Sequence, residues 1–282
     1  MEKIKFSDGV SETLLINLYF RSLENLVKKP ILKDEFSGEI VKHLDYDFSK
    51  FDKSKLSRVG TVIRAKFFDD EILKIANEDK SENNDLVIIQ VGAGLDTRPL
   101  RLESKISNAI FYDLDLCDVI NLREKLVKKA KNNFYIASSM FETTWMDELV
   151  SKHKNAKFIF VLEGVTMYFE KPKLKEFFKN LLDRFHGVLM ADFLNKFAAN
   201  FPQSRHDAMK FIKNAKFKFG IDSEDEILEF DDRLQFIKKG VMFDMYKNRW
   251  GILGFILRNF VPKVKNSCNM YIFKLNEKYL NH

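Results

Sequence analysis

Hydrophobic and polar positions follow two periods along this chain, and the order in which the periods alternate predicts the fold class. Apolar runs that are too short for globular helices predict buried strands at residues 86–91, 109–114, 134–137, 158–162 and 187–192. Between these runs apolar residues recur at helical spacing, most clearly over residues 172–185. Because parallel strands need crossover helices, the alternation predicts an α/β fold with a doubly wound, mostly parallel, Rossmann-like sheet.

Amphipathic helices are expected before the first strand, over residues 11–24, 34–44 and 54–76. We therefore expect residues 1–80 to form an N-terminal helical extension and residues 81–282 to form the α/β domain. Within that domain we expect an insertion near residues 195–260 to cover a substrate. The weaker pattern after Phe193 predicts helices over residues 195–213 and 221–232 and a late strand over residues 270–274.

The composition is typical of a protein with a large core and a mixed surface. Of the 282 residues, 45% are hydrophobic and only 5 are Pro, so few residues interrupt regular structure. The formal net charge of +6 comes from 47 basic and 41 acidic residues that are interspersed along the chain. We interpret this pattern as a solvated surface and expect no nucleic-acid partner.

The cysteines and the apolar stretches of the sequence indicate which cellular compartment to expect for this protein. Cys117 and Cys268 stand far apart without a cluster of ligand residues, which suggests neither a disulfide framework nor a metal site. Residues 1–6 lack the apolar core of a signal peptide, and the apolar stretch at 251–257 is followed by Arg258 and is too short to span a bilayer. We expect a cytoplasmic protein with no membrane partner, and its oligomeric state stays open.

Candidate chemistry begins where the first predicted strand ends. Gly92 and Gly94 let the backbone bend sharply and lie against a ligand where a Cβ would obstruct it. Thr97 stands in place of the third glycine of the dinucleotide fingerprint, so the glycine pair alone is a weak signal. Asp113 and Asp115 strengthen it, because they end a second apolar strand about 20 residues later, where such folds place a ribose-binding carboxylate. Together these residues predict a nucleotide-binding turn.

One further carboxylate lies at a predicted strand end. Glu163 directly follows five apolar residues and precedes Gly164, so it needs a partner or a ligand. The carboxyl ends of the strands are where open α/β sheets bind ligands, and Glu163 belongs with the glycine turn and Asp115 on that edge. For Asp115 the structural alternative is a cap of the next helix, whose expected N-cap is Asp118.

These motifs resemble those of a known family. Three blocks, at residues 91–98, 112–116 and 162–168, resemble the signature blocks of the leucine carboxyl methyltransferase family, and above all its bacterial branch of polyketide O-methyltransferases. Residues 10–14 with Arg21 resemble the opening of the same family. Each block alone is unspecific, and the resemblance is carried by their combination in this order.

The resemblance implies a class I methyltransferase fold that uses S-adenosyl-L-methionine as its cofactor. It places the glycine turn at the amino-acid part of the cofactor, Asp115 at the ribose, and Glu163 and Arg64 at the amino and carboxylate ends of the methionine. Ser139, where the family often has Asp, and Met140 would lie beside the adenine. The implied cofactor-binding set is Arg64, Gly92, Ala93, Gly94, Asp96, Asp113, Asp115, Ser139, Met140 and Glu163. Without the resemblance, Arg64 would be interpreted as an arginine on a helix that forms an ordinary ion pair at the surface.

The implied function is that of an O-methyltransferase acting on a carboxylate or hydroxyl of a small or medium acceptor. A carboxylate is already ionised at neutral pH, whereas a phenol must lose its proton to a base. His206 is considered as that base and Tyr168 as a contact of the acceptor, but a surface histidine and a core tyrosine explain both, so no catalytic residue is assigned. Residues that could form an apolar acceptor pocket, or simply pack in the core, are Phe201, Phe217, Phe219 and Trp250.

Two other function classes stay open at this point. A nicotinamide-dependent oxidoreductase would share the glycine turn and the acidic strand end, although Thr97 counts against it. A non-catalytic regulator would keep the cofactor pocket and transfer nothing. Binding of nicotinamide dinucleotide would identify the first, and absence of methyl transfer the second.

Overall fold

The structure is a computed structural model that describes residues 2–3, 9–78, 86–106 and 108–276. Its centre is a seven-stranded sheet with the strand order β5-β4-β3-β6-β7-β9-β8. The first five strands of this order run parallel, and β9 pairs antiparallel with both β7 and β8. The strands are β3 Leu86–Val91, β4 Ala109–Asp115, β5 Asn133–Ala137, β6 Lys157–Leu162, β7 Gly187–Leu194, β8 Leu234–Val241 and β9 Cys268–Leu275. The predicted fold class is confirmed.

Helices cover both faces of the sheet, and the side-chain period of two decides which residues meet them. Leu86 and Ile88 of β3 pack on one face with helix α4 (Lys55–Glu78), whereas Val87 and Ile89 pack on the other face with α7 (Thr144–Lys152) and α8 (Lys171–Leu182). Helix α5 (Arg98–Leu102) follows β3, and α6 (Cys117–Leu126) connects β4 to β5. Every residue of β3 is buried, and all of them except Gln90 are apolar, as expected for a central strand of a parallel sheet.

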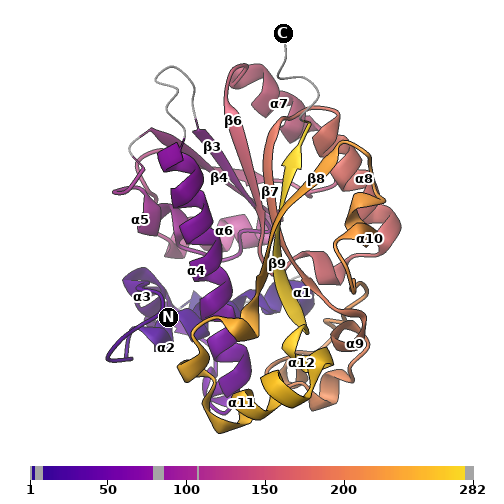
Figure 1. Ribbon diagram of the computed structural model, residues 1–282. Helices are drawn as coiled ribbons and strands as arrows, with labels where there is room; N and C mark the ends of the chain where they lie inside the picture. The colour runs from indigo at the N-terminus through magenta and orange to yellow at the C-terminus, as the bar shows by residue number, and fades with distance from the viewer. Residues whose placement is uncertain (1, 4–8, 79–85, 107, 277–282) are drawn as a thin grey trace.

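The remaining helices gather at the carboxyl ends of the parallel strands, at the lower end of Figure 1. They are α1 Gly9–Glu12, α2 Leu14–Glu24, α3 Glu35–His43, α9 Lys196–Ala199, α11 Gly251–Phe260 and α12 Pro262–Lys265. Helix α10 (Asp225–Leu228) lies elsewhere and precedes β8, and a short pair β1 (Glu2–Lys3) and β2 (Leu44–Asp45) joins the N-terminus to α3. No helix in the described part of the chain combines the length and the apolar character needed to cross a bilayer.

Most predicted elements are present. The helices expected over 34–44 and 54–76 are α3 and α4, and the one expected over 11–24 is interrupted at Thr13 between α1 and α2. Helix α4 packs on the sheet itself, and the division of the chain at residue 80 stays a prediction. Residues 1 and 4–6 of the stretch used in the signal-peptide argument lie outside the described residues.

Three local predictions were wrong. Asp118 is not the N-cap of α6, because the helix begins at Cys117 with Leu116 as its cap and Asp118 lies in its first turn. Residues 195–213 form the short α9 and two single turns instead of one helix, since Pro202 interrupts the segment. Phe197 and Phe201 of this segment line a cavity. The helix expected over 221–232 is only the four residues of α10.

Candidate functional site

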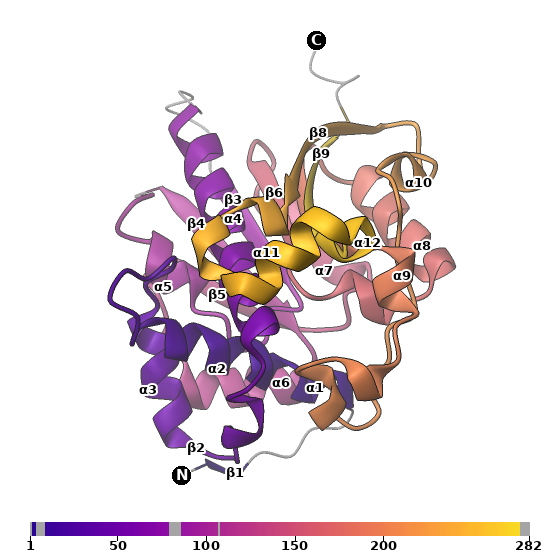
Figure 2. The same ribbon diagram turned by 60° about the horizontal axis from the view of Figure 1, so that its bottom comes forward.

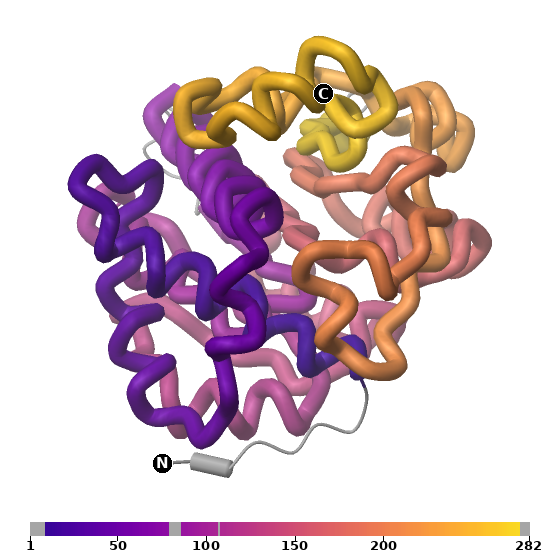
Figure 3. Tube along the Cα trace, turned by 90° about the horizontal axis from the view of Figure 1, so that it is seen from below, coloured from indigo at the N-terminus to yellow at the C-terminus, as the bar shows by residue number. Residues whose placement is uncertain are grey.

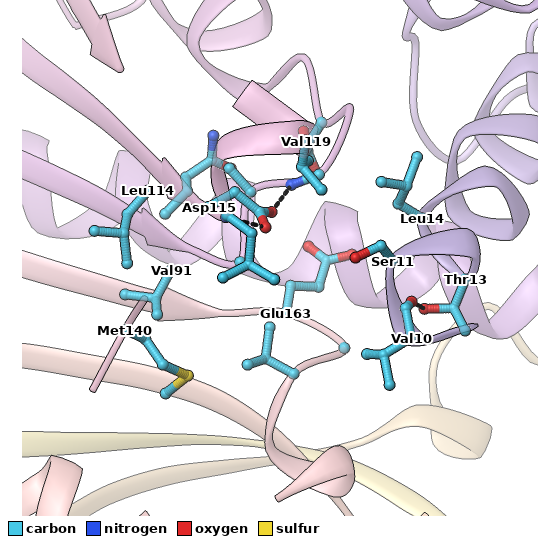
Figure 4. A pocket seen from close by; sticks show the side chains of 18 of the residues that line it. Val10, Ser11, Thr13, Leu14, Val91, Leu114, Asp115, Val119, Met140 and Glu163 are labelled. Atoms are coloured by element: carbon cyan, nitrogen blue, oxygen red, sulfur yellow. Dashed lines mark hydrogen bonds between the residues drawn. The ribbon is translucent and has the colours of Figure 1, made fainter. Parts of the chain in front are cut away.

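A cavity of about 370 Å³, called here the first cavity, lies at the carboxyl ends of β3, β4 and β6. The turn after β3 forms one wall, and α1 with the start of α2 lies opposite (Figure 4). Asp115 and Glu163 both point into the space between these walls (Figure 4). Of the residues predicted to bind the cofactor, this cavity is lined by Gly92, Ala93, Gly94, Asp96, Asp115, Ser139, Met140 and Glu163.

The turn after β3 requires glycine. Gly92 and Gly94 have φ values of +70° and +51°, in the left-handed region that side chains disfavour. A Cβ on Gly92 would lie 2.6 Å from Cγ2 of Val165, so the turn presses closely on the loop that follows Glu163. The backbone N–H groups of Gly92 and Ala93 both donate to the carbonyl oxygen of Leu114, at 2.9 and 3.1 Å. The turn is therefore held against β4 with its backbone bare toward the cavity.

Asp115 ends β4 beside this turn. Its Oδ2 accepts the N–H of Gly94 at 2.7 Å, and its Oδ1 accepts the N–H of Leu116 at 2.8 Å. Burial raises the pKa of Asp115 to about 6, and the two backbone hydrogen bonds only partly oppose that rise. Because this carboxylate lines the cavity, it can also accept hydrogen bonds from hydroxyls of a ligand.

Asp113 lies beneath the turn and does not line the cavity. It is completely buried and accepts hydrogen bonds from Arg123 at 2.7 Å, from Asn133 at 2.8 Å and from Gln90. The same Arg123 donates through Nη1 to the carbonyl oxygen of Gly94 at 2.9 Å. Asp113 thus orients Arg123, which anchors the turn through its hydrogen bond to Gly94.

Glu163 is the meeting point of two buried arginines. Its Oε2 accepts Nη2 of Arg98 at 2.5 Å and its Oε1 accepts Nε of Arg64 at 3.2 Å. Arg64 also donates to Asp192 at 2.9 Å and to Asn17 at 3.1 Å, and it lines a neighbouring cavity instead of the first one. Asp192 and Glu163 together raise the pKa of Arg64 against the opposing effect of burial, so it stays charged.

Two other arginines, Arg21 and Arg98, line the first cavity. Arg21 of α2 is buried, lines this cavity, and pairs with Asp34 at 3.0 Å and with Asp96 at 3.4 Å. Burial opposes the ionisation of Asp96, but Arg101, Arg21 and Arg98 outweigh it and hold the pKa of Asp96 well below its usual range. The sequence assigned no role to Arg21, and the only signal for it was the family-like opening of the chain.

Ser139 and Met140 follow β5 and form the side of the cavity beyond Asp115. The N–H of Ser138 donates to the carbonyl oxygen of Asp115 at 3.0 Å, which ties this loop to the end of β4. The Ser139 hydroxyl accepts the N–H of Phe141 at 3.3 Å, and Met140 is buried beside it. The loop lines the cavity with two serines and with the apolar side chains of Met140 and Phe141.

A second cavity of about 410 Å³ adjoins the first, and both are lined by Thr13, Asn17, Gly164 and Tyr168. Its lining comes from α2 and α4, from the segment around α9, and from Trp250 and Val264 on either side of α11. Figure 3 shows the chain from the end at which these segments lie. Three of the four aromatic residues expected in an acceptor pocket, Phe201, Phe217 and Trp250, line the second cavity. Phe219 does not line it and packs against Phe193 and Phe230 instead.

His206 and Tyr168 also line the second cavity. Nδ1 of His206 accepts the N–H groups of Ala208 at 3.3 Å and Met209 at 3.1 Å, so the neutral ring carries its proton on Nε2. Burial lowers the pKa of His206, which keeps the ring neutral at pH 7. Burial raises the pKa of Tyr168 to about 12, so its phenol stays protonated. Both side chains are hydrogen-bond donors at neutral pH.

Comparison with known proteins decides the family. The family model described as leucine carboxyl methyltransferase matches residues 16–182, more than half of the chain. The chain belongs to the leucine carboxyl methyltransferase family. Like other members, this protein is an S-adenosyl-L-methionine-dependent methyltransferase, and the nicotinamide alternative is not favoured.

Relatives of this methyltransferase agree with that assignment. It is 26% identical over 237 residues to the tetracenomycin polyketide synthesis O-methyltransferase TcmP of Streptomyces glaucescens, covering 84% of each chain. It is 24% identical over 188 residues to the S-adenosyl-L-methionine-dependent methyltransferase dpfgK of Gibberella zeae, covering 63% of this chain and 62% of that protein. A crystal structure of a putative methyltransferase from Thermobifida fusca shares the fold, with a TM-score of 0.56, 11% identity, and coverage of 91% of this chain and 94% of that one.

The raised pKa of Asp115 gives the first testable prediction. A ligand whose hydroxyls donate to Asp115 would favour the ionised carboxylate and lower its pKa below the value of about 6 in the free protein. We expect affinity for S-adenosyl-L-methionine to be constant near pH 7 and to fall by up to about tenfold per pH unit as the pH drops through 6. Titration calorimetry between pH 5 and 7 measures this. An Asp115→Asn variant with the same pH dependence would assign the proton to another group.

Proposed function

We propose that this enzyme transfers a methyl group from S-adenosyl-L-methionine in the first cavity to an oxygen of a small or medium acceptor in the second cavity. The two cavities share Thr13, Asn17, Gly164 and Tyr168, so a donor in one and an acceptor in the other meet across a common boundary. When bound, the cofactor supplies a sulfonium-activated methyl group. The chain itself contributes orientation, which is the main requirement of an in-line displacement.

The residues of the first cavity fit this cofactor by charge and shape. We assign the ribose to Asp115, the adenine to Ser139 and Met140, the amino-acid part to the bare turn at Gly92–Gly94, and the ammonium to Glu163. Arg21 lines the first cavity whereas Arg64 lines the second, so we assign the cofactor carboxylate to Arg21 and give Arg64 the role of holding Glu163. Asp113 acts through Arg123 on the turn, and Asp96 orients Arg21.

The charges behind the cavity support the same assignment. One connected network of ion pairs contains four arginines and one more carboxylate than arginines, namely Arg21, Arg64, Arg98 and Arg101 with Asp34, Asp69, Asp96, Glu163 and Asp192. At neutral pH the cofactor carries an ammonium and a sulfonium but one carboxylate. The surplus negative charge of the network therefore complements the net positive charge of the cofactor.

The second cavity favours a carboxylate over a hydroxyl as the acceptor, and this observation carries the proposal. Three of the side chains that line it present a proton to the cavity or keep one at neutral pH, namely Tyr168, His206 and Cys268. Tyr168 is protonated, His206 presents its proton on Nε2, and burial raises the pKa of the Cys268 thiol. The carboxylate of Asp207 accepts hydrogen bonds from the backbone N–H and the hydroxyl of Ser57. A carboxylic acid with a pKa near 4 needs no base, whereas a phenol near 10 does.

The chemical stability of the product tests this proposal. Enzyme, methyl-labelled S-adenosyl-L-methionine and a panel of aromatic and aliphatic carboxylic acids and phenols are incubated together, and the products are treated with mild alkali. We expect labelled product from carboxylic acids, with the label released as volatile methanol because methyl esters hydrolyse and ethers do not. The Asp115→Ala variant, with its weakened cofactor site, is the control for background labelling. Alkali-stable label would identify a hydroxyl acceptor, and absence of label with the panel and with cell extract would favour a non-catalytic regulator.

A further inference from the structure

Helix α11 carries its apolar side chains on the outside of the protein. Ile252 is 82% exposed and Phe260 73% exposed, and Leu253, Phe255 and Ile256 between them are exposed as well. The helix lies across the surface of the molecule in Figures 2 and 3. We call these five side chains the α11 face. A contiguous apolar face of this kind is unusual on a protein surface and indicates an interaction site.

The orientation of α11 has a local cause. Gly254 is the buried residue of the helix, and a Cβ there would lie 2.3 Å from Cβ of Trp250, so the helix rests closely on Trp250 through its smallest residue. Trp250 stacks on Phe243 at 4.2 Å between ring centroids and donates through its indole N–H to the carbonyl oxygen of Met245 at 3.0 Å. The anchor leaves the larger apolar side chains pointing away from the core.

The charge around α11 selects the partner. Residues 245–276 contain six basic residues and no acidic one, in a chain where 47 basic and 41 acidic residues are otherwise mixed. Arg249 pairs with Glu24 at 2.8 Å and Lys265 with Asp244 at 2.9 Å. Lys247 before the helix, Arg258 within it and Lys263 after it have no carboxylate within ion-pair distance in the described part of the chain. The α11 face is therefore flanked by unneutralised positive charge.

We propose that α11 docks this enzyme onto an anionic lipid surface. An interfacial helix places its apolar side chains at the boundary of headgroups and acyl chains and its cations among acidic headgroups. A second copy of the chain is disfavoured as the occupant, because two such faces would bring their positive charges together. From the sequence we expected no membrane partner, because no apolar stretch is long enough to span a bilayer. At ten residues, α11 is about 15 Å long and lies on a bilayer without crossing it.

The helix is also close to the second cavity. Trp250 and Val264, on either side of α11 in the chain, line that cavity, as does the exposed Phe197 of α9. The side chain of Asn195, the N-cap of α9, donates to the carbonyl oxygen of Lys263 in α12 at 2.7 Å, so α9 and α12 are tied together at this wall. If the second cavity holds the acceptor, which rests on the proposed function, docking brings the acceptor site to a surface that dissolves apolar carboxylic acids.

Vesicle sedimentation tests the proposal. The whole protein is mixed with phosphatidylcholine vesicles with or without about 30% phosphatidylglycerol, at low and high salt. We expect at least tenfold stronger partition onto the anionic vesicles at low salt, because each cation near the surface adds to the attraction and salt screens it. The double variant Ile252→Glu with Phe260→Glu should lose at least tenfold of this partition.

A matched variant keeps the test specific. Ile237→Glu makes the same substitution at an exposed position, 51% accessible on the edge strand β8, outside the α11 face, and should bind vesicles as the unaltered protein does. None of the three substituted residues lines either cavity, so titration with S-adenosyl-L-methionine reports whether each variant is folded. Because cofactor binding and vesicle binding are measured separately, failure of this proposal is distinguishable from failure of the proposed function. Equal partition of the double variant and the unaltered protein would overturn the proposal. So would sedimentation analysis showing a dimer that the double variant dissociates without any vesicle binding.

Discussion

Replacing Asp115 with alanine is expected to lower the affinity for S-adenosyl-L-methionine by at least about a hundredfold. The proposed role of Asp115 is to accept the ribose hydroxyls, and hydrogen bonds to a charged acceptor contribute about 1.5–3 kcal/mol each. The substitution also removes the acceptor of the Gly94 N–H, so the turn at the cofactor site loses an anchor. Titration calorimetry gives the dissociation constant directly.

Asp118→Ala is the matched control for this substitution. Asp118 lies three positions along the chain in the first turn of α6 and does not line either cavity. Its replacement should leave the affinity within about threefold of the unaltered protein. Equal losses in the two variants would mean that the effect comes from α6 or from general acidity of the region, and the ribose assignment would have to be abandoned.

Replacing Arg98 with methionine is expected to destabilise the fold by about 3–5 kcal/mol. Arg98 is fully buried and donates to Asp69 and Gln90 at 2.7 Å and to Glu163 at 2.5 Å. Methionine keeps much of the volume but leaves buried carboxylates short of their positive partner, which costs far more than the pair itself contributes. Urea unfolding followed by circular dichroism measures the loss.

Arg184→Met provides the comparison. Arg184 also forms an ion pair, with Asp147 at 2.6 Å, but that pair is exposed to solvent. Exposed pairs contribute about 0–1 kcal/mol, so the unfolding midpoint should hardly move. Similar losses for both arginines would show that burial of the network around Arg98 is not what makes it important.

The same network explains how the N-terminal helices are held over the cofactor site. Asp34 caps α3 by accepting the N–H of Ser37 at 3.2 Å. It also accepts Nε of Arg21 and the hydroxyl of Thr97, which follows the glycine turn. The carboxylate of Asp34 thereby links the cap of α3, Arg21 in the wall of the first cavity and the turn after β3.

The local sequence pattern determined those elements that form through interactions between residues close in sequence. The run of β3, the glycines after it and the stripe of α8 each follow from propensity and spacing, and they were predicted with correct type and near-correct limits. The sequence also placed Asp115 and Glu163 at strand ends, which lie at the same edge of a parallel sheet. Edge strand β8 was missed because Gln235, Lys238 and Lys239 interrupt its apolar pattern on the solvent side.

Tertiary structure alone decided what the charged side chains touch. Arg64 donates to Glu163, Asp192 and Asn17, which are 99, 128 and 47 residues away in sequence. Local sequence patterns do not predict contacts between residues so far apart. Asp113 and Asp115 look equivalent in the sequence, but Arg123 reaches only the first from α6 and leaves the second to the cavity.

The outward face of α11 has the same origin. Periodicity shows that a helix has an apolar side, but the packing of Gly254 on Trp250 determines which way that side points. Strands and turns form from interactions over a few residues, which the order of amino acids states directly. The partners of a buried charge and the exposure of a helix face depend on which distant segments the fold brings together, and that is decided only when the chain has packed.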